Sequence, residues 1–140
     1  MSSTSPRVIE SRNNPVFKGL RRLLSGHGIR KEGRALFSGA RLVGEAGSRY
    51  PDRCEAWITS GPGMPGPPES LPDLVHYRLG SDLFRELDMA GTHSPLLLVR
   101  PPAIESWLPQ SGLPPGLTLF IPFQDPENVG AVIRSAAAFG

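Results

Sequence analysis

The sequence predicts a mixed α/β fold, and three of its features support this prediction. Short apolar runs alternate with segments whose apolar residues recur at helical spacing, which is typical of helices that cover a sheet. The 140 residues are 39% hydrophobic and 20% charged, which is ordinary for a globular protein that buries a core. The 16 glycines and 16 prolines exceed average usage, so we also expect much turn and linker.

A first helix is predicted from about residue 15 to residue 25. Asn14 is a good helix cap, Pro15 suits the first helical turn, and Phe17 and Leu20 then recur at helical spacing. The basic residues of this segment fall on the opposite side, so the helix is expected to bury one stripe and expose a cationic one. A glycine-rich stretch after the helix is expected to break the pattern.

The other elements of the first hundred residues follow from the same rules. Between residues 60 and 72, proline and glycine are too frequent for a strand or a helix, so this stretch is predicted as a flexible surface loop. Around that loop we expect strands at 35–37, 54–59, 75–79 and 95–99, a helix at 41–46, and a short helix capped by Ser81 and ending at Leu87.

The chain is predicted to contain two domains joined by a linker. Residues 1–100 form the first domain, the proline-rich residues 101–115 form the linker, and residues 116–140 begin the second domain. In this last part an apolar strand at 117–123 is expected to lead into a helix at 127–139. One strand and one helix cannot close a core, so we expect residues beyond position 140, or another chain, to complete the second domain.

Positive charge is concentrated in the first 50 residues. They carry ten Lys and Arg against three acidic residues, a net charge of +7, whereas the remaining residues carry five against ten, a net charge of −5. A concentrated basic segment is typical of proteins with a phosphate-rich partner, because each neutralised phosphate releases condensed counterions. On composition alone, a solvated basic face explains the charge equally well.

The sequence also restricts the class of protein by what it lacks. Cys54 is the only cysteine, so the chain forms no internal disulfide and no cysteine-based metal site, which suits a reducing cytosol. No apolar run is long enough for a signal peptide or for the roughly 18 residues of a membrane span. We therefore expect a soluble cytoplasmic protein without a metal.

The segment with the most informative pattern is QDPENVGAVIRSAAAFG, residues 124–140. An ordinary strand-to-helix junction accounts for part of it, since Asp125 can cap a helix and Pro126 suits the first helical position. Two features exceed that reading. Gly130 costs about 1 kcal/mol relative to alanine inside a helix, so a close approach to the backbone is expected there. Arg134 lies four residues later on the same face, where a guanidinium can bind a phosphate through two hydrogen bonds.

This segment resembles the first motif of the SpoU or TrmH family of RNA 2'-O-methyltransferases, which are knotted, S-adenosylmethionine-dependent enzymes. The resemblance rests on Asp125-Pro126-x-Asn128-x-Gly130-Ala131-x-x-Arg134 and on the closing Ala138-Phe139-Gly140. The N-terminal part is similar to the family's substrate-binding domain, an α/β fold akin to certain ribosomal RNA-binding proteins. Its cues are Ser11-Arg12-Asn13-Asn14-Pro15, Lys18, Leu20-Arg21, Gly39-x-Arg41-Leu42-Val43 and Glu45-Ala46.

The resemblance implies a reaction in which a ribose 2'-hydroxyl attacks the methyl group of S-adenosylmethionine. Arg134 would orient and activate the hydroxyl together with its phosphate, and Asn128 would hold the site by hydrogen bonds. Ribosomal RNA is the expected substrate, with transfer RNA the alternative, and a homodimer is expected for the full-length form. The cofactor-binding motifs are expected beyond Gly140, so this chain alone is predicted to be inactive. The residues expected to bind RNA are Arg12, Lys18, Arg21, Arg22 and Arg41.

Two positions depart from the family pattern, and two other readings stay open. Ser38 stands where family members often carry glutamate, and Thr92-His93-Ser94-Pro95 replaces the more usual proline, glutamine and glycine pattern. His93 is a lone loop histidine and is not expected to be catalytic. The alternatives to an enzyme are a noncatalytic RNA-binding module, with Asn128 and Arg134 as an RNA clamp, and a structural or partner-binding domain.

Overall fold

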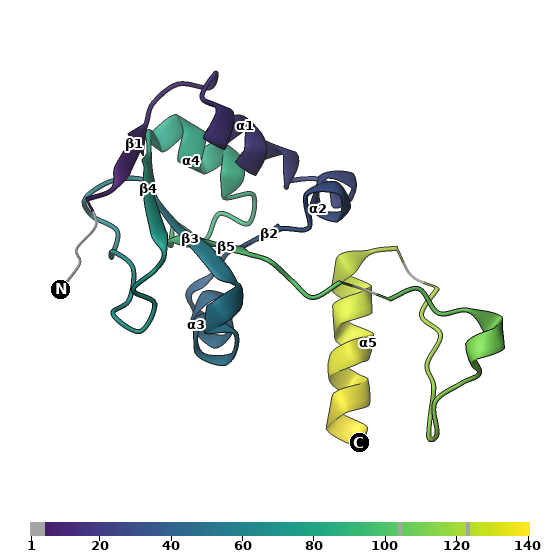
Figure 1. Cartoon of the computed structure of the whole chain (residues 1–140). Helices are drawn as coiled ribbons and strands as arrows, with labels where there is room; N and C mark the ends of the chain where they lie inside the picture. Colours follow the sequence, from purple (N-terminus) through teal and green to yellow (C-terminus); the bar gives the residue numbers. More distant parts are fainter. Residues whose placement is uncertain (1–4, 104, 123) are drawn as a thin grey trace. The chain divides into compact units, whose positions relative to one another are not determined.

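The computed structural model describes residues 5–103, 105–122 and 124–140, and the chain divides into two compact units after Ala103. The first unit contains a sheet with helices, and the second contains a long helix preceded by irregular chain (Figure 1). The mixed α/β class expected from the sequence is confirmed. The two units are described separately below.

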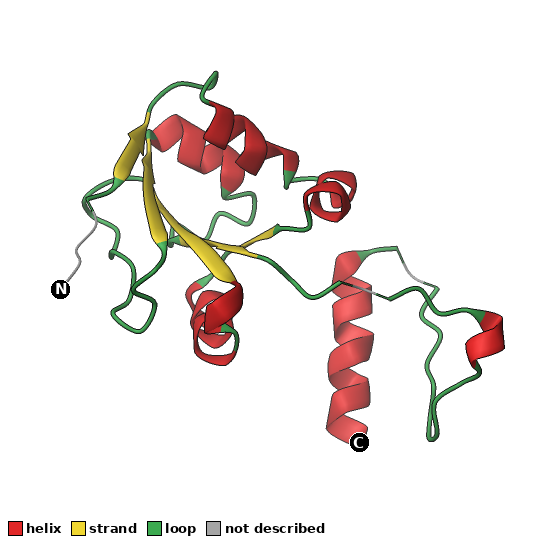
Figure 2. Cartoon of the chain, viewed as in Figure 1, coloured by secondary structure: helices red, strands yellow, loops and turns green. Residues whose placement is uncertain are grey.

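The first unit is built on a five-stranded sheet of mixed direction (Figure 2). The strand order is β1-β4-β3-β5-β2, in which β1, β4 and β3 run parallel while β5 is antiparallel to both of its neighbours. The bounds of the strands are β1 Arg7–Ile9, β2 Ala35–Phe37, β3 Cys54–Thr59, β4 Val75–Leu79 and β5 Leu96–Val99. Strands β2 to β5 were predicted within one residue, whereas the short β1 was not.

Helices cover both faces of this sheet. Helices α1 and α4 lie on one face and α3 lies on the other (Figure 1), and each face has its own cluster of buried apolar residues. Consecutive residues of β3 divide between the clusters, since Ile58 belongs to the first and Trp57 to the second, as the alternation of a strand requires. The helix bounds are α1 Pro15–Arg22, α2 Gly26–Glu32, α3 Ala40–Arg49 and α4 Ser81–Leu87.

The glycine-rich stretch after α1 forms a helix, so the prediction of a break there was wrong. Ser25 caps this helix, α2, by accepting a hydrogen bond from the Gly28 amide at 3.0 Å, and Gly33 ends it with a φ of 62°. A Cβ at Gly28 would lie 1.8 Å from the carbonyl oxygen of Arg22. Glycine here permits the close approach of α1 and α2 rather than ending a helix.

Three smaller expectations also needed correction. The cap of α4 is Gly80 rather than Ser81, and no side chain caps that helix. Helix α3 is longer than the predicted 41–46, because tertiary packing of Val43 and Ala46 supports turns that its glycines weaken. The loop between β3 and β4 is not wholly at the surface, since Leu71 is buried in the second cluster.

The second unit contains helix α5, Pro126–Phe139, and a 3-10 turn at Pro109–Ser111. The strand expected at 117–123 is absent over residues 117–122, and Phe123 lies outside the described residues. A strand needs a partner for its backbone amide and carbonyl groups, and the described part of this unit contains no other strand to supply one. Across all described residues, no helix is long and apolar enough to cross a membrane.

Candidate nucleic-acid interface

Helix α1 presents the cationic stripe that its sequence predicts. Phe17 and Leu20 are buried against the sheet, whereas Lys18, Arg21 and Arg22 are exposed on the other side of the helix. Residues three and four apart are neighbours on a helix surface, so these three cations share one patch. Asn14 caps the helix, as expected, by accepting a hydrogen bond from the Val16 amide at 2.9 Å.

Glu86 of α4 neutralises part of this stripe, which the sequence could not show. Its carboxylate lies 3.0 Å from Arg12 Nη1 and 2.8 Å from Arg21 Nε, and one carboxylate therefore contacts two arginines. The Arg12 approach is an ion pair rather than an aligned hydrogen bond, because Glu86 Oε2 has no hydrogen-bond partner. The side chains of Arg12 and Arg21 are 62% and 59% exposed, so a phosphate can reach either guanidinium from the solvent side.

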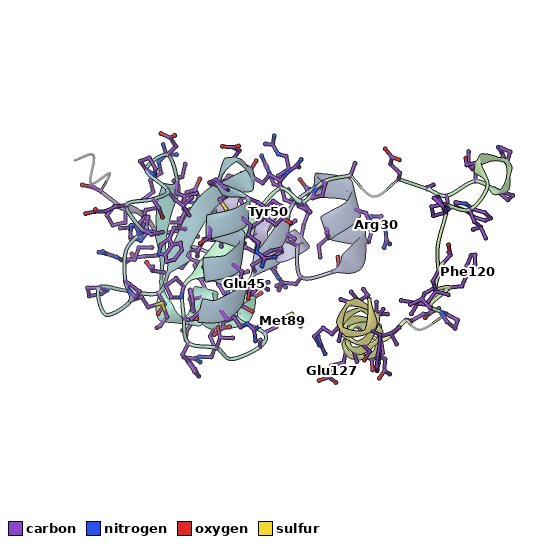
Figure 3. The ribbon with its side chains drawn as sticks, turned by 90° about the horizontal axis from the view of Figure 1, so that it is seen from below. Arg30, Glu45, Tyr50, Met89, Phe120 and Glu127 are labelled. Carbon is purple, nitrogen blue, oxygen red and sulfur yellow. The ribbon has the colours of Figure 1, made fainter. Side chains whose placement is uncertain are left out.

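Helix α2 adds cations that were missed because the helix itself was missed. Arg30 and Lys31 lie in its last turn and are exposed, and Arg30 extends away from the helix (Figure 3). Arg22 Nε donates a hydrogen bond of 2.9 Å to Glu32 Oε1, which ties α1 to the end of α2. The available sequence signal was Ser25, a capping residue, followed by a glycine just past the last turn.

The structure separates Arg41 from the other residues expected to bind RNA. Arg41 lies on α3, which covers the sheet face opposite to α1 (Figure 1). Its Nε donates to Glu45 Oε1 at 3.1 Å within the same helix, and its side chain is 92% exposed. A single flat surface therefore cannot include both Arg41 and the α1 stripe.

The turn after α4 is fixed by a buried carboxylate. Asp88 accepts hydrogen bonds from the His93 amide at 2.8 Å, the Thr92 amide at 3.1 Å and the Thr92 hydroxyl at 3.0 Å. Burial raises the pKa of Asp88, but these hydrogen bonds and the nearby His93 outweigh burial, so the net pKa is lowered. His93 itself has a positive φ of 51°, and its contribution to this turn is the backbone amide that donates to Asp88.

A second buried polar pair lies within the sheet. Thr59 Oγ1 and His76 Nε2 are 3.0 Å apart on neighbouring strands β3 and β4, and both residues are buried. Burial lowers the pKa of His76, and the positive charge of Arg78 lowers it further. This pair satisfies polar groups inside the fold, which is a structural role.

Helix α5 positions the two residues predicted to be catalytic. Asp125 caps the helix by accepting from the Glu127 amide at 3.0 Å, and it also accepts from Asn128 Nδ2 at 3.1 Å. Pro126 occupies the first helical position, as expected. Asn128 is therefore held by the cap at the start of the helix while its side chain stays exposed.

Arg134 folds over the glycine that precedes it by one helical turn. A Cβ at Gly130 would lie 3.1 Å from Arg134 Nη1, so glycine gives the guanidinium room against the helix backbone. Asn128 and Arg134 do not meet, because six residues along a helix correspond to a rotation of about 240° beyond one full turn. The helix thus aims an amide and a guanidinium in different directions.

Helix α5 does not by itself enclose a nucleotide-sized cofactor. Helix α5 has no buried residue, so Asn128 and Arg134 line no closed wall that could hold S-adenosylmethionine. Among the described residues, no three His, Cys, Asp or Glu side chains gather in a way that could hold a metal ion.

Two known proteins to which the chain is similar are described as RNA methyltransferases. In sequence it is 52% identical over 135 residues to "Ribosomal RNA small subunit methyltransferase G 2" of Syntrophobacter fumaroxidans (strain DSM 10017 / MPOB). In structure it resembles an RNA 2'-O ribose methyltransferase, with a TM-score of 0.65 and 23% identity. No family model matches the chain.

The chain corresponds to only part of each of these proteins. The sequence match covers 96% of the chain but 27% of the relative, and the structural match covers 96% of the chain and 53% of the solved one. At 23% identity the structural match shows a shared fold alone. The two descriptions also name different things, a small-subunit ribosomal RNA in one and a ribose 2'-oxygen in the other.

Proposed function

We propose that this chain is the RNA-binding part of an RNA methyltransferase that acts on ribosomal RNA. In this proposal the first unit holds the RNA, and α5 contributes side chains to the site of methyl transfer. The single observation that carries the proposal is the exposed cationic stripe of α1 on a fold shared with an RNA 2'-O ribose methyltransferase. Because the chain spans about a quarter of its sequence relative, the activity of a whole protein belongs to this proposal.

The electrostatics of the first unit support binding to phosphate. Lys18, Arg30 and Lys31 have no ion pair among the described residues, and the arginines of α1 hold only exposed ones. The side chains of Arg21 and Arg22 are more than half exposed, so a phosphate can bind their guanidinium groups from the solvent side while Glu86 and Glu32 stay in place. Ribose hydroxyl contacts then distinguish RNA from DNA.

The reaction that we propose is methylation of a ribose 2'-hydroxyl, as in the SpoU or TrmH family. Arg134 binds the phosphate next to the target ribose, and the lack of a side chain at Gly130 lets the Arg134 guanidinium lie against the helix. Asn128, fixed by Asp125, donates or accepts a hydrogen bond at the start of the same helix. Positioning of this kind is what a weak nucleophile such as a ribose hydroxyl requires.

S-adenosylmethionine is the proposed methyl donor. When bound, it would supply an electrophilic methyl group to the ribose oxygen: the bond between the methyl carbon and sulfur would break, the hydroxyl proton would pass to solvent, and S-adenosylhomocysteine would leave. Since α5 encloses no cavity of its own, we propose that the 140-residue chain binds this donor too weakly for catalysis. Titration of S-adenosylmethionine into the chain by calorimetry should give no measurable heat of binding, and saturable binding would overturn this part of the proposal.

RNA binding tests the proposal most directly. Replacement of Lys18, Arg21 and Arg22 by alanine should weaken binding to a fluorescent fragment of small-subunit ribosomal RNA. Each phosphate contact that is lost should reduce the slope of log K against log salt by about 0.7 to 0.9. A matched triple variant, in which the exposed Arg7, Arg49 and Arg53 become alanine, removes the same charge from elsewhere and should keep most of the slope.

A comparison of these two triple variants also tests where on the surface the RNA binds. Equal loss from both would show that only net charge matters, which favours a solvated basic face. Because Arg21 contacts the half-buried Glu86, circular dichroism should confirm that the first variant folds. Lys18→Ala alone, which breaks no ion pair of the described structure, should reduce the slope by about one.

The ribose chemistry requires a separate test. The chain, together with any residues that its gene encodes after Gly140, should transfer a methyl group to ribosomal RNA, and the modified bond should resist alkaline cleavage. Arg134→Ala should lower kcat more than it raises KM, since Arg134 is proposed to orient the reacting ribose. Methylation of a base in place of ribose would reject the 2'-O specificity and keep the broader class.

A noncatalytic RNA-binding module is the second candidate. The observation in its favour is that α5 leaves all its side chains unburied in the described structure. In this case Asn128 and Arg134 clamp RNA without any methyl transfer. RNA binding without methylation, even in the presence of residues encoded after Gly140, would establish the module.

A further inference from the structure

A half-open cleft lies in the first unit, beside α1 on the sheet face that α1 and α4 cover. Its volume is about 550 Å³, which falls in the range of small-molecule sites. Helix α1 forms one wall, the end of α2 forms another, and the starts of β3 and β4 form the floor. Every lining residue belongs to the first unit, and none of them was predicted as a base-binding residue.

The floor of the cleft is apolar and its rim is charged. Tyr77, Val75 and Leu98 supply the floor, and the Tyr77 ring is half-buried against the first core cluster. At the rim, Arg34 Nε lies 2.6 Å from Glu55 Oε2, and this pair faces open space. Such a site matches a flat ligand with an apolar face and a polar edge.

Resting on the proposed function, we infer that this cleft takes one unstacked base of the bound RNA, and that it prefers guanine. The position of Arg22 favours this occupant, because Arg22 lies both on the cationic stripe of α1 and in the lining of the cleft. A base inside the cleft therefore places its own phosphate next to the stripe. Unstacked bases held on aromatic or guanidinium planes are the usual means by which proteins read single-stranded RNA.

The preference for guanine follows from the groups at the rim. Asp73 is exposed at the cleft and has no ion pair among the described residues, so its carboxylate can accept hydrogen bonds from the guanine N1 and N2 groups. Arginine is the usual donor to guanine O6 and N7, and Arg34, which also lines the cleft beside Glu55, is 44% exposed. Adenine lacks both the O6 acceptor and the N2 donor.

Gly19 gives a way to fill the cleft without changing its charge. It lines the cleft from the middle of α1, and a Cβ there would meet only the flexible end of Arg22, at 3.8 Å. A leucine at this position therefore projects into the cleft without a backbone clash. Gly44 on α3 offers the matched control, because it is also helical and exposed with nothing within 4 Å of an added Cβ.

The first experiment titrates guanosine 5'-monophosphate into the whole 140-residue chain and follows amide shifts by NMR. The expected result is saturable shifts at Tyr77 and Val75, with adenosine 5'-monophosphate binding about tenfold more weakly. Gly19→Leu should abolish these shifts, and Gly44→Leu should leave them unchanged. Asp73→Asn should remove the preference for guanine, whereas Asp52→Asn removes the same charge outside the cleft and should keep it.

The outcome separates this inference from the proposed function. If salt-dependent RNA binding persists while guanosine 5'-monophosphate gives no shifts at the cleft, the cleft proposal fails and the RNA-binding proposal stands. If RNA binding is absent and the mononucleotide still binds, the function fails and the base site stands. Equal affinity for both mononucleotides would overturn the guanine preference, and unaltered binding by Gly19→Leu would overturn the location.

Discussion

The two units of this chain differ in how their apolar residues are used. In the first unit Phe17, Ile58 and Leu96 are fully buried between helices and a sheet. In the second unit α5 buries nothing, and Leu117 and Phe139 are about nine-tenths exposed. Both units have well-formed helix caps, so local signals do not distinguish them.

This difference shows what a core requires beyond local pattern. The first unit has five strands that pair with one another, and helices cover both faces of the sheet that they form (Figure 1). The apolar residues at 117–122 have no partner strand within the described chain and remain irregular. An apolar run therefore becomes a strand only where another strand satisfies its backbone.

The largest expected effect comes from the fully buried Phe17. Phe17→Ala should lower the free energy of unfolding of the first unit by about 3–5 kcal/mol, because it leaves a cavity beneath α1. Ile133→Ala in α5, where the side chain is 55% exposed, should change stability by less than about 0.5 kcal/mol. Urea unfolding measures both variants.

The two tryptophans allow each unit to be followed separately in that experiment. Trp57 lies in the core of the first unit and Trp107 in the second, so a Trp107→Phe background reports on the first unit alone. Comparable destabilisation by the Phe17 and Ile133 variants would mean that α5 is packed in solution, which would remove the contrast between the units.

A buried hydrogen-bond acceptor should have the next largest effect. Asp88→Ala leaves the amides of Thr92 and His93 without their partner, and we expect a loss of about 2–3 kcal/mol. Thermal unfolding by circular dichroism measures this loss, with the exposed Asp52→Ala as the control. A change as small as that of the control would show that water replaces the carboxylate in this turn.

Helix caps give a smaller effect and compare the units on equal terms. Asn14→Ala should lower the stability of the first unit by about 1 kcal/mol, because α1 is coupled to the core. Asp125→Ala should reduce only the helicity of residues 126–139. Amide hydrogen exchange measures the protection of each unit separately. If either variant lowered the protection of both units, the two units would not be independent.

The smallest effect concerns pH and is confined to the first unit. Burial lowers the pKa of His76 in the folded state below its ordinary value of 6.5. Near and below that pH, the unfolded chain therefore binds more protons at this histidine than the folded chain does. Stability should therefore fall modestly from pH 7 to pH 6, where the unfolded histidine is only partly protonated. His76→Gln should flatten this decline, and an unchanged slope would show that His76 is not its source.

Much of the first unit followed from sequence because its elements have strong local signals. β3 was predicted with its bounds intact, since CEAWIT alternates between two buried faces, and the caps at Asn14 and Asp125 were predicted from residue type. Strand β1 was missed because its three residues form a strand only by pairing with β4. In the candidate site, likewise, Lys18 was predicted on α1 from local spacing. Glu86 of α4, which contacts Arg21 of α1, was not predicted.

The sequence by itself determined the fold class, the cationic stripe of α1, and the setting of Arg134 against Gly130. Each of these depends on residues within a few positions of one another, where spacing along a helix or strand fixes the geometry. Tertiary structure alone decided that Arg41 lies on the opposite sheet face, that Glu86 meets two arginines, and that a cleft opens beside α1. These features join residues far apart in the chain, and their positions depend on strand order, which local pattern does not specify.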